Sequence, residues 1–425
     1  MVSHEKVPSD MARSEGPTSG LKGLPFDLEV GTGWNLFDAA IGFPVAVLHE
    51  SAIRHNSATM AAFCARHGVS HAPHGKTTMA PAIFRIQLGD GCWGITAATV
   101  WQAAKMREAG VPRVIIANEV VVPAEIEWLG QAVAEGFDVM CYVDSLDGVR
   151  LLDEVLAANP DHPRLAVLLE VGVRGGRTGV RSLDEALSVA RAAAESPRLI
   201  LTGVSGFEGI LGAEGDRTDR EVVVDFLDSI VDAAHAVHAE DLFEPAPEVI
   251  VTAGGSAYFD YVLERFERVD LGDTPTRIVL RTGGYISHDD VGYNRKSPMG
   301  ATPRVEEGSA LQASIEIWAA VLSRPEPTRA LVGLGKRDAA SDGRLPVAKK
   351  VRRRGSTTVE SIEPNEVSVI NDQHAYLDLD PEDPLAVGDL VGFGIGHPCT
   401  TFDKWRVMLM VDDDYRVTEL AHTIF

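Results

Sequence analysis

The central part of the chain alternates short apolar, β-forming runs with longer alanine-rich stretches of helical periodicity. The apolar runs lie at 69–74, 92–96, 113–118, 137–143, 165–171, 201–207, 248–253 and 277–281. Strands that are apolar throughout and are joined by helices are typical of a parallel sheet covered on both faces. About eight such units over about 240 residues favour a closed (β/α)8 barrel. An open doubly wound sheet is the alternative.

After about residue 290 the helical periodicity fades, and short runs punctuated by Val, Gly, Pro and Asp take over. This pattern predicts antiparallel strands. We therefore predict an α/β protein with a TIM-type barrel at 50–295 and a second, C-terminal antiparallel β domain at 296–425. A strand within 26–49 is predicted to belong to that β domain. Residues 1–25 are polar and rich in Pro, Ser and Gly, and they predict a flexible tail without the apolar stretch of a signal peptide.

Composition and net charge limit the kinds of binding partner that we expect for this protein. The 425 residues include 39 Lys and Arg against 62 Asp and Glu, so the net charge is −23 and the mean field repels nucleic acid and anionic membranes. No run approaches the ~20 apolar residues needed to cross a bilayer. Four cysteines are too few for a disulfide framework, which favours a reducing compartment, the cytoplasm. The basic run KKVRRRG at 349–355 is interpreted as a solvated hairpin tip.

A lysine directly follows the first predicted barrel strand, in the segment HAPHGKTTMAP at 71–81. Side chains at the carboxyl ends of barrel strands face the active site. Burial lowers the pKa of a lysine and makes its amine reactive toward carbonyl groups. Lys76 is therefore a candidate catalytic residue, although its spacing alone favours a surface lysine paired with a carboxylate.

Glycine-rich turns follow three of the predicted strands, in EVGVRGGRTGV, TAGGSAYFD and RTGGYISHD. Such turns expose backbone N–H groups that bind anions. The last two turns follow the final barrel strands, which is the usual place for a phosphate in this kind of barrel. Each turn by itself is more often a plain connection, and the position of the last two together raises the weight of the functional interpretation.

A histidine and a cysteine lie two residues apart in GFGIGHPCTTFDKW at 392–405. In an extended segment the side chains of His397 and Cys399 point the same way. Imidazole and thiolate are suitable ligands for Zn²⁺, and two ligands leave the metal open to a substrate. The alternative is a half-buried histidine and a core cysteine in a β domain.

Taken together and in this order, these segments resemble the fold-type III pyridoxal-phosphate (PLP) enzymes, in the branch of the D-serine dehydratases and D-threonine aldolases. PHGKT at 73–77 is similar to the family segment whose lysine bonds the cofactor, RGGRTG at 174–179 to its arginine turn, and HPC at 397–399 to its metal motif. The resemblance implies that Lys76 and His74 lie at the cofactor and that Arg177 contacts its phenolate oxygen. It also implies a zinc ion, or another divalent metal, on His397 and Cys399. The residues implied at the phosphate are Gly254, Gly255, Ser256, Gly283, Gly284 and Tyr285.

The resemblance further implies a PLP- and zinc-dependent dehydration of a 3-hydroxy-D-amino acid, such as D-serine or D-threonine, to a 2-oxo acid and ammonia. Cys399 favours the dehydratase, because well-known aldolase members have Asp at that position. Retro-aldol cleavage to glycine and an aldehyde is the alternative, followed by racemisation and by a non-catalytic PLP-binding protein. Position 172 is Gly where the family often has Asp, and Arg281 and Glu208 are both candidates for the partner of the pyridine nitrogen. A homodimer is expected by analogy.

Overall fold

The apolar runs form the eight parallel strands of one sheet in the computed structural model, which describes residues 21–425 except 23, 25–31, 39–40, 244–245 and 307. The order in this sheet is β2-β9-β8-β7-β6-β5-β4-β3. The two ends of the sheet meet, because His74 bridges Thr96 and the Trp93 N–H donates to the His71 carbonyl over 2.8 Å. The predicted barrel is thus confirmed over the open sheet. Its strands are β2 (Ser70–His71), β3 (Ile95–Ala97), β4 (Arg113–Glu119), β5 (Asp138–Val143), β6 (Leu165–Val171), β7 (Leu199–Gly206), β8 (Val249–Ala253) and β9 (Thr276–Leu280).

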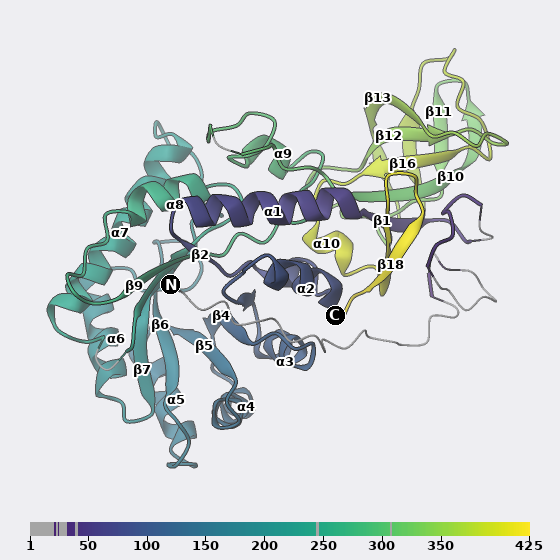
Figure 1. Cartoon of the computed structure of the whole chain (residues 1–425). Coiled ribbons are helices and arrows are strands. Elements are labelled where there is room, and N and C mark those ends of the chain that lie inside the picture. Colours follow the sequence, from purple (N-terminus) through teal and green to yellow (C-terminus); the bar gives the residue numbers. More distant parts are fainter. Residues whose placement is uncertain (1–20, 23, 25–31, 39–40, 244–245, 307) are drawn as a thin grey trace.

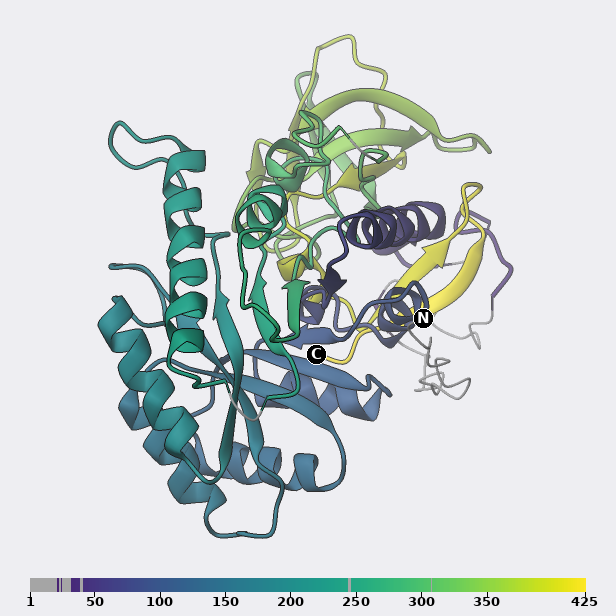
Figure 2. The same ribbon diagram turned by 60° about the vertical axis from the view of Figure 1, so that its left-hand side comes forward.

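Helices cover the outside of this barrel, as Figures 1 and 2 show. Their starts follow the sequence signals. The Ser182 side chain accepts from the Glu185 N–H at the start of α6, and Thr218 forms a capping box with Glu221 at the start of α7. The helices of the barrel are α1 (Glu50–Arg66), α2 (Pro81–Gly89), α3 (Val100–Glu108), α4 (Pro123–Ala134), α5 (Leu146–Leu156), α6 (Leu183–Glu195), α7 (Asp219–Ala239) and α8 (Phe259–Phe266).

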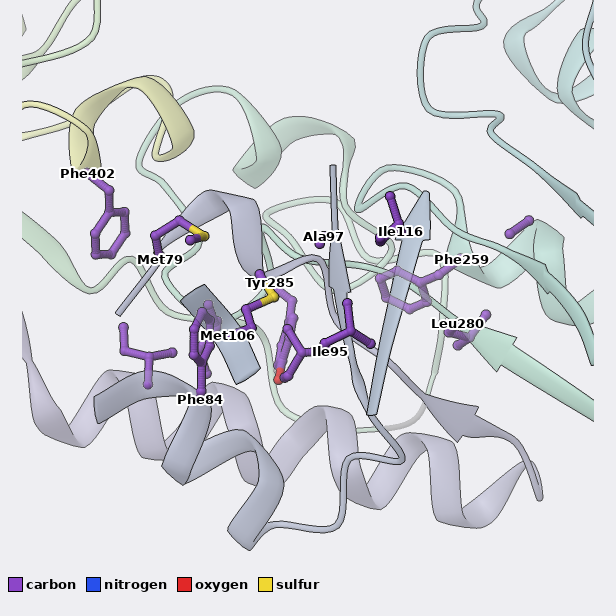
Figure 3. Packing of buried hydrophobic residues seen from close by; sticks show 14 of the residues in the cluster. Met79, Phe84, Ile95, Ala97, Met106, Ile116, Phe259, Leu280, Tyr285 and Phe402 are labelled. Carbon is purple, nitrogen blue, oxygen red and sulfur yellow. The ribbon is translucent and has the colours of Figure 1, made fainter. Parts of the chain in front are cut away.

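The main hydrophobic core lies between these helices and the strands and continues into the second sheet. Figure 3 shows Phe84, Ile95 and Met106 packed together, with Tyr285 beside them. A smaller cluster that includes Ile115, Leu168 and Val279 fills the barrel interior. Burial of these side chains supplies the main stabilising free energy, at about 25 cal/mol per Å² of apolar surface.

The second sheet is mostly antiparallel, as predicted, and it contains one parallel pair. That pair is formed by β1, which precedes the barrel in sequence but lies between β10 and β17, with Val45 opposite Trp318 and Val47 opposite Leu409. Figure 1 shows α1 leading from this sheet to the barrel. The strands are β1 (Val45–His49), β10 (Ile315–Glu326), β11 (Arg329–Val332), β12 (Val347–Arg352), β13 (Glu360–Glu366), β14 (Val369–Ile370), β15 (Ala375–Asp378), β16 (Leu390–Gly394), β17 (Val407–Val411) and β18 (Val417–His422).

The basic run at 349–355 corrects one prediction. Lys349 and Lys350 are not at a solvated tip, because they belong to β12, which pairs with β13 on one side and β16 on the other. The Lys350 Nζ lies 2.7 Å from the Glu316 Oε1, and the Glu316 side chain is 1% exposed. Strand β10, which lies on the far side of β16, thus supplies a buried carboxylate that sequence spacing does not reveal. Only the following residues, from Arg353, form the turn.

The predicted tail at 1–25 lies largely outside the described residues. At its end, the Lys22 Nζ lies 2.7 Å from the Asp338 Oδ1 and 3.7 Å from the centre of the Trp405 ring, and Leu24 is buried. This end is therefore held by the second sheet domain. Across the part of the chain that the structure describes, no helix is both long and apolar enough to span a membrane.

Candidate active site

Lys76 lies at the carboxyl end of the first barrel strand, in the short helix η1 (Gly75–Thr77). The glycine before it is required by packing. A Cβ at Gly75 would lie 2.6 Å from the Ile95 Cγ2 and 2.7 Å from the Met106 Cε. The chain can therefore turn tightly against the core and present Lys76 to a cavity of about 190 Å³. The cavity is lined by His74, Lys76, Ala98, Ala117, Asn118, Tyr142, Glu170, Arg177, Thr178, Phe207, Gly254 and Arg281.

The cavity depresses the basicity of its lysine. Burial lowers the pKa of Lys76, and the charges of Arg177 and Arg281 lower it further, whereas Cys399 acts in the opposite direction. Burial and the same cations also hold the pKa of His74 well below its ordinary value. The His74 Nδ1 is buried and has no hydrogen-bond partner among the described residues. Lys76 is therefore less basic than an exposed lysine, and the His74 imidazole is neutral at physiological pH.

Two arginines line the same cavity in different ways. Arg177 comes from the glycine-rich turn after β6, and its guanidinium lies 4.5 Å from the centre of the Phe207 ring. Arg281 follows β9 and is 3% exposed. It donates to the Ser205 and Thr252 hydroxyls and to the Gly206 carbonyl. Arg281 is thus fixed in the barrel mouth, whereas Arg177 is exposed on a turn.

The glycine loop after β8 binds an anionic oxygen in this structure. The N–H groups of Gly254 and Gly255 donate to the carboxylate of Glu208, over 3.1 Å for Gly254. The next loop is linked to it, because the Gly284 N–H donates to the Ser256 Oγ over 3.0 Å. These amides are thus directed at a side-chain oxygen, and their predicted contact with a phosphate stays a prediction. Glu208 is held by these amides and is not among the residues that line the cavity.

The structure places the side chain of Tyr285 away from this cavity. Its ring is 1% exposed and its hydroxyl accepts from the Gln87 Nε2 over 3.1 Å, within the core that Figure 3 shows. Only its backbone remains for the predicted contact with a phosphate. Gly283 lies at the site for a steric reason, because a Cβ there would lie 2.5 Å from the His74 carbonyl oxygen.

His397 and Cys399 lie together beside Lys76, although they are more than 300 residues further along the chain. The helix α10 (Cys399–Phe402) packs on η1, and the Cys399 Sγ lies 3.2 Å from the Thr77 Oγ1. The His397 Nδ1 lies 2.9 Å from the Asp342 Oδ2, and the Thr400 hydroxyl donates to the other Asp342 oxygen. The segment is helical from Cys399 and not extended, and it still brings imidazole and thiol together.

The protonation of this pair is shifted in opposite directions. A hydrogen bond with Cys399 raises the pKa of His397 to about 9. Burial by itself would raise the pKa of Cys399, but hydrogen bonds from His397 and Thr77 and the positive charges of His397 and Lys76 lower it below its ordinary value. The thiol therefore loses its proton more readily than an ordinary cysteine. The resulting thiolate is the form that binds metal, and it stabilises nearby positive charge.

Three residues of this region carry no assigned role in the sequence analysis. Asp342 is found only by folding, since it lies 55 positions before His397. Tyr293 packs on the glycine loop, where a Cβ at Gly284 would lie 2.9 Å from its ring. Glu170 had a usable signal, because it is a carboxylate near the carboxyl end of an otherwise apolar barrel strand.

A closed parallel barrel with a lysine at the mouth of its first strand, an arginine turn and a second β domain define a fold-type III PLP enzyme. Comparison with known families agrees. Residues 48–269 match the alanine racemase N-terminal domain, and residues 314–411 match a putative serine dehydratase domain. The chain belongs to the alanine racemase N-terminal domain family, whose members bind PLP.

Curated relatives cover most of the chain. A 3-hydroxy-D-aspartate aldolase of Paracoccus denitrificans (strain Pd 1222) is 26% identical over 376 residues, which are 87% of this chain and 89% of that protein. A D-threonine aldolase of Arthrobacter sp is 27% identical over 348 residues, or 81% of this chain and 82% of the relative. Both relatives are lyases.

Solved structures share the whole architecture. The D-threonine aldolase from Filomicrobium marinum has a TM-score of 0.74 at 23% identity and covers 93% of this chain and 98% of its own. The D-threo-3-hydroxyaspartate dehydratase from Delftia sp. HT23 has a TM-score of 0.71 at 18% identity, with coverage of 91% and 98%. The fold is thus shared by aldolases and by a dehydratase, and these relatives place the chain among PLP-dependent lyases.

Proposed function

We propose that this chain is a PLP- and zinc-dependent lyase that dehydrates a 3-hydroxy-D-amino acid to a 2-oxo acid and ammonia. The proposal rests on the proximity of two sites. The cavity of Lys76 lies next to the His397–Cys399 pair, which is linked to it through the 3.2 Å contact between Cys399 and Thr77. A carbonyl-reactive amine and a metal-binding pair at one cavity are suited to a substrate with an α-amino group and a β-hydroxyl group.

The residues of the cavity fit PLP. Lys76 would bond the cofactor, Arg177 would face its phenolate oxygen, and Arg281 would face its pyridine nitrogen. The loops at Gly254 and Gly284, where N–H groups already hold a carboxylate and a hydroxyl, would bind the phosphate. When bound, PLP supplies the electron sink that stabilises negative charge at Cα.

Lys76 performs the proton chemistry in this proposal. Because its pKa is lowered by burial and by two arginines, a larger fraction of its amine is neutral at physiological pH than for an exposed lysine. In its neutral form the amine would bond the cofactor carbonyl with loss of water, and once a substrate amine had displaced it, it would take the Cα proton. The fixed position of η1 against the core holds the Nζ at the mouth of the barrel.

The His397–Cys399 pair fits a divalent metal with open positions. The His397 Nδ1 is oriented by Asp342, an arrangement that leaves the other ring nitrogen to a metal. Two protein ligands would leave further positions of a tetrahedral metal to the substrate and water. A zinc ion there would supply Lewis acidity for the β-hydroxyl as it leaves. A related D-threo-3-hydroxyaspartate dehydratase has been solved as a cysteine-to-alanine mutant in a metal-free form.

Retro-aldol cleavage is the second candidate, because the two curated relatives described above are named aldolases. It would use the same lysine. The metal would then assist loss of the β-hydroxyl proton instead of departure of the hydroxyl group.

Product analysis with D-threonine separates these reactions. We expect 2-oxobutanoate and ammonia from the purified holoenzyme. Glycine with acetaldehyde would instead establish the aldolase, and L-threonine or L-allothreonine would indicate racemisation.

Removal of the metal tests the proposed role of zinc in the reaction. We expect a chelator, His397→Ala and Cys399→Ala each to lower the rate at least about a hundredfold, because Lewis-acid assistance is worth several kcal/mol. Added Zn²⁺ should restore the chelated wild type only. Cys64→Ala, which removes a buried thiol of α1, is the control and should keep its response to the metal. Full activity after complete metal removal would contradict the metal role.

We also propose a homodimer in which a second copy covers the mouth of the barrel. Large apolar side chains are 40–54% exposed at the starts of successive barrel helices, which form the carboxyl-end rim around the cavity: Trp101, Val121, Val122, Leu146 and Leu183. An apolar rim of this kind is typical of an interface. We expect Val121→Asp with Leu146→Asp to shift the mass in light scattering from dimer to monomer. Ala158→Asp, at the opposite end of the barrel, should remain dimeric, and a monomeric wild type would contradict the proposal.

A further inference from the structure

Two carboxyl groups face each other in the mouth of the barrel. Glu119 ends β4 and Glu170 lies near the end of β6, on either side of β5, where Tyr142 is opposite Glu119 in register. Glu170 is 6% exposed and lines the cavity of Lys76. Both Glu119 oxygens and the Glu170 Oε2 are buried and find no donor among the described residues. The Tyr142 hydroxyl is likewise buried without a partner.

Two adjacent buried carboxylates repel each other strongly, and one shared proton removes this repulsion. Burial, followed by the charge and hydrogen bonding of Glu170, raises the pKa of Glu119 to about 9. Glu119 therefore retains a proton at neutral pH, and Glu170 accepts a hydrogen bond from it. The proton gives each group the hydrogen-bond partner that no other described side chain supplies.

The charges around the pair favour this state. Asp144, directly after β5, adds negative charge and accepts from the Gly179 N–H over 2.9 Å. Arg281 lies across the Tyr142 ring, 5.6 Å from its centre, and its donors are used by hydroxyl and carbonyl groups and not by these carboxyls. The remaining titratable or charged groups near the pair are Cys141 on β5, Lys76 and His74 at η1, and Arg177 in the turn after β6.

We propose that Glu119 and Glu170 share one proton in a hydrogen bond between them, so that the pair meets the cavity of Lys76 with one negative charge instead of two. The inference rests on the proposed function, since it places the cofactor in this cavity. With the proton, the pair contributes a single negative charge to the wall of the cavity. Without it, two negative charges face the phosphorylated cofactor as it enters.

Infrared spectroscopy of the apo-protein tests the shared proton without the cofactor. We expect the carbonyl band of a protonated carboxyl group at about pH 7 that disappears with a midpoint near pH 9. Glu119→Gln should lack the band, and Glu170→Gln should move its midpoint to lower pH because the like charge is gone. Glu127→Gln, an exposed position on α4, should match the wild type. Absence of the band in the wild type, or an unchanged band in both variants, would overturn the proposal.

PLP titration of the apo-protein tests the role toward the cofactor. Between about pH 8 and about pH 10, the wild-type affinity should decline, by about tenfold per pH unit above the midpoint, because one proton must be bound. Glu119→Gln should lose this decline, whereas Glu127→Gln should keep it. A variant with only a structural defect would lower the affinity equally at each pH, and parallel curves for Glu119→Gln and the wild type would refute the role. If the wild type binds no PLP at any pH, the proposed function fails, and the infrared result still reports on the proton.

Discussion

Lys76→Ala is expected to abolish the reaction and the visible absorbance of a cofactor bonded to the protein. The amine has two tasks in the proposed chemistry, to bond the cofactor carbonyl and to take the Cα proton. Loss of a proton-transferring group alone costs about 10²–10⁴ in rate. We therefore expect the turnover rate to fall at least about 10³-fold, measured by release of the 2-oxo acid from the PLP-loaded enzyme.

The matched control for this experiment is Lys105→Ala on α3, where the lysine pairs with Glu108 on the surface. It should retain the absorbance and the rate. Far-ultraviolet circular dichroism should be unchanged in both variants, because Lys76 is half-buried at a cavity and does not belong to the packed core. Visible absorbance that persists in Lys76→Ala would show that another amine bonds the cofactor.

Glu316→Gln is expected to lower the free energy of unfolding by about 3–5 kcal/mol, because it removes the buried charge from an ion-pair network. The Glu316 Oε1 lies 2.7 Å from the Lys350 Nζ, and its Oε2 lies 3.0 Å from the His49 Nε2. The Tyr415 hydroxyl also donates to Oε2, over 2.9 Å. The network joins β1, β10 and β12, so its loss should shift the denaturant midpoint of the second sheet domain.

The contribution of Glu316 to the free energy of unfolding depends on pH with a defined sign. Burial by itself would raise the pKa of Glu316, but His49 and the charges of Lys349 and Lys350 more than offset it and hold the pKa well below its ordinary value near 4.5. The stabilisation is therefore complete above about pH 4.5 and is lost as the pH falls toward the folded-state value. Wild type and Glu316→Gln should thus converge in stability under acid conditions.

Glu419→Gln is the control for this pair of measurements. Glu419 pairs with Arg85 at 2.7 Å, but both side chains are about one-third exposed. An exposed pair of this kind contributes about 0–1 kcal/mol. Equal losses for the two variants would show that the buried network has no special role in stability.

The secondary structure of the barrel could be predicted from sequence because each strand buries both faces. All eight predicted apolar runs are strands of the observed sheet. The basic run at 349–355 shows the limit of this reasoning. Lysines are placed on the surface by composition alone, and only the pairing of β12 with β16, which pairs in turn with β10, brings them to the Glu316 carboxylate.

The candidate site divides in the same way. Lys76 and the glycine turns could be located because a parallel barrel presents all its carboxyl ends on one face. The residues that contact the site from distant parts of the chain could not be located from the sequence. Asp342 beside His397, Cys399 beside Thr77, and Glu208 on the amides of Gly254 and Gly255 depend on contacts between distant segments.

The sequence by itself determined the closed barrel, the second β domain and the family to which the chain belongs, because periodicity and short motifs are local properties. Only the tertiary structure decided which side chains share a cavity and what state they are in. It buries the Tyr285 side chain in the core, and it brings Glu170 next to Glu119. Burial and proximity fix protonation, and both arise from packing between strands that are far apart in the chain.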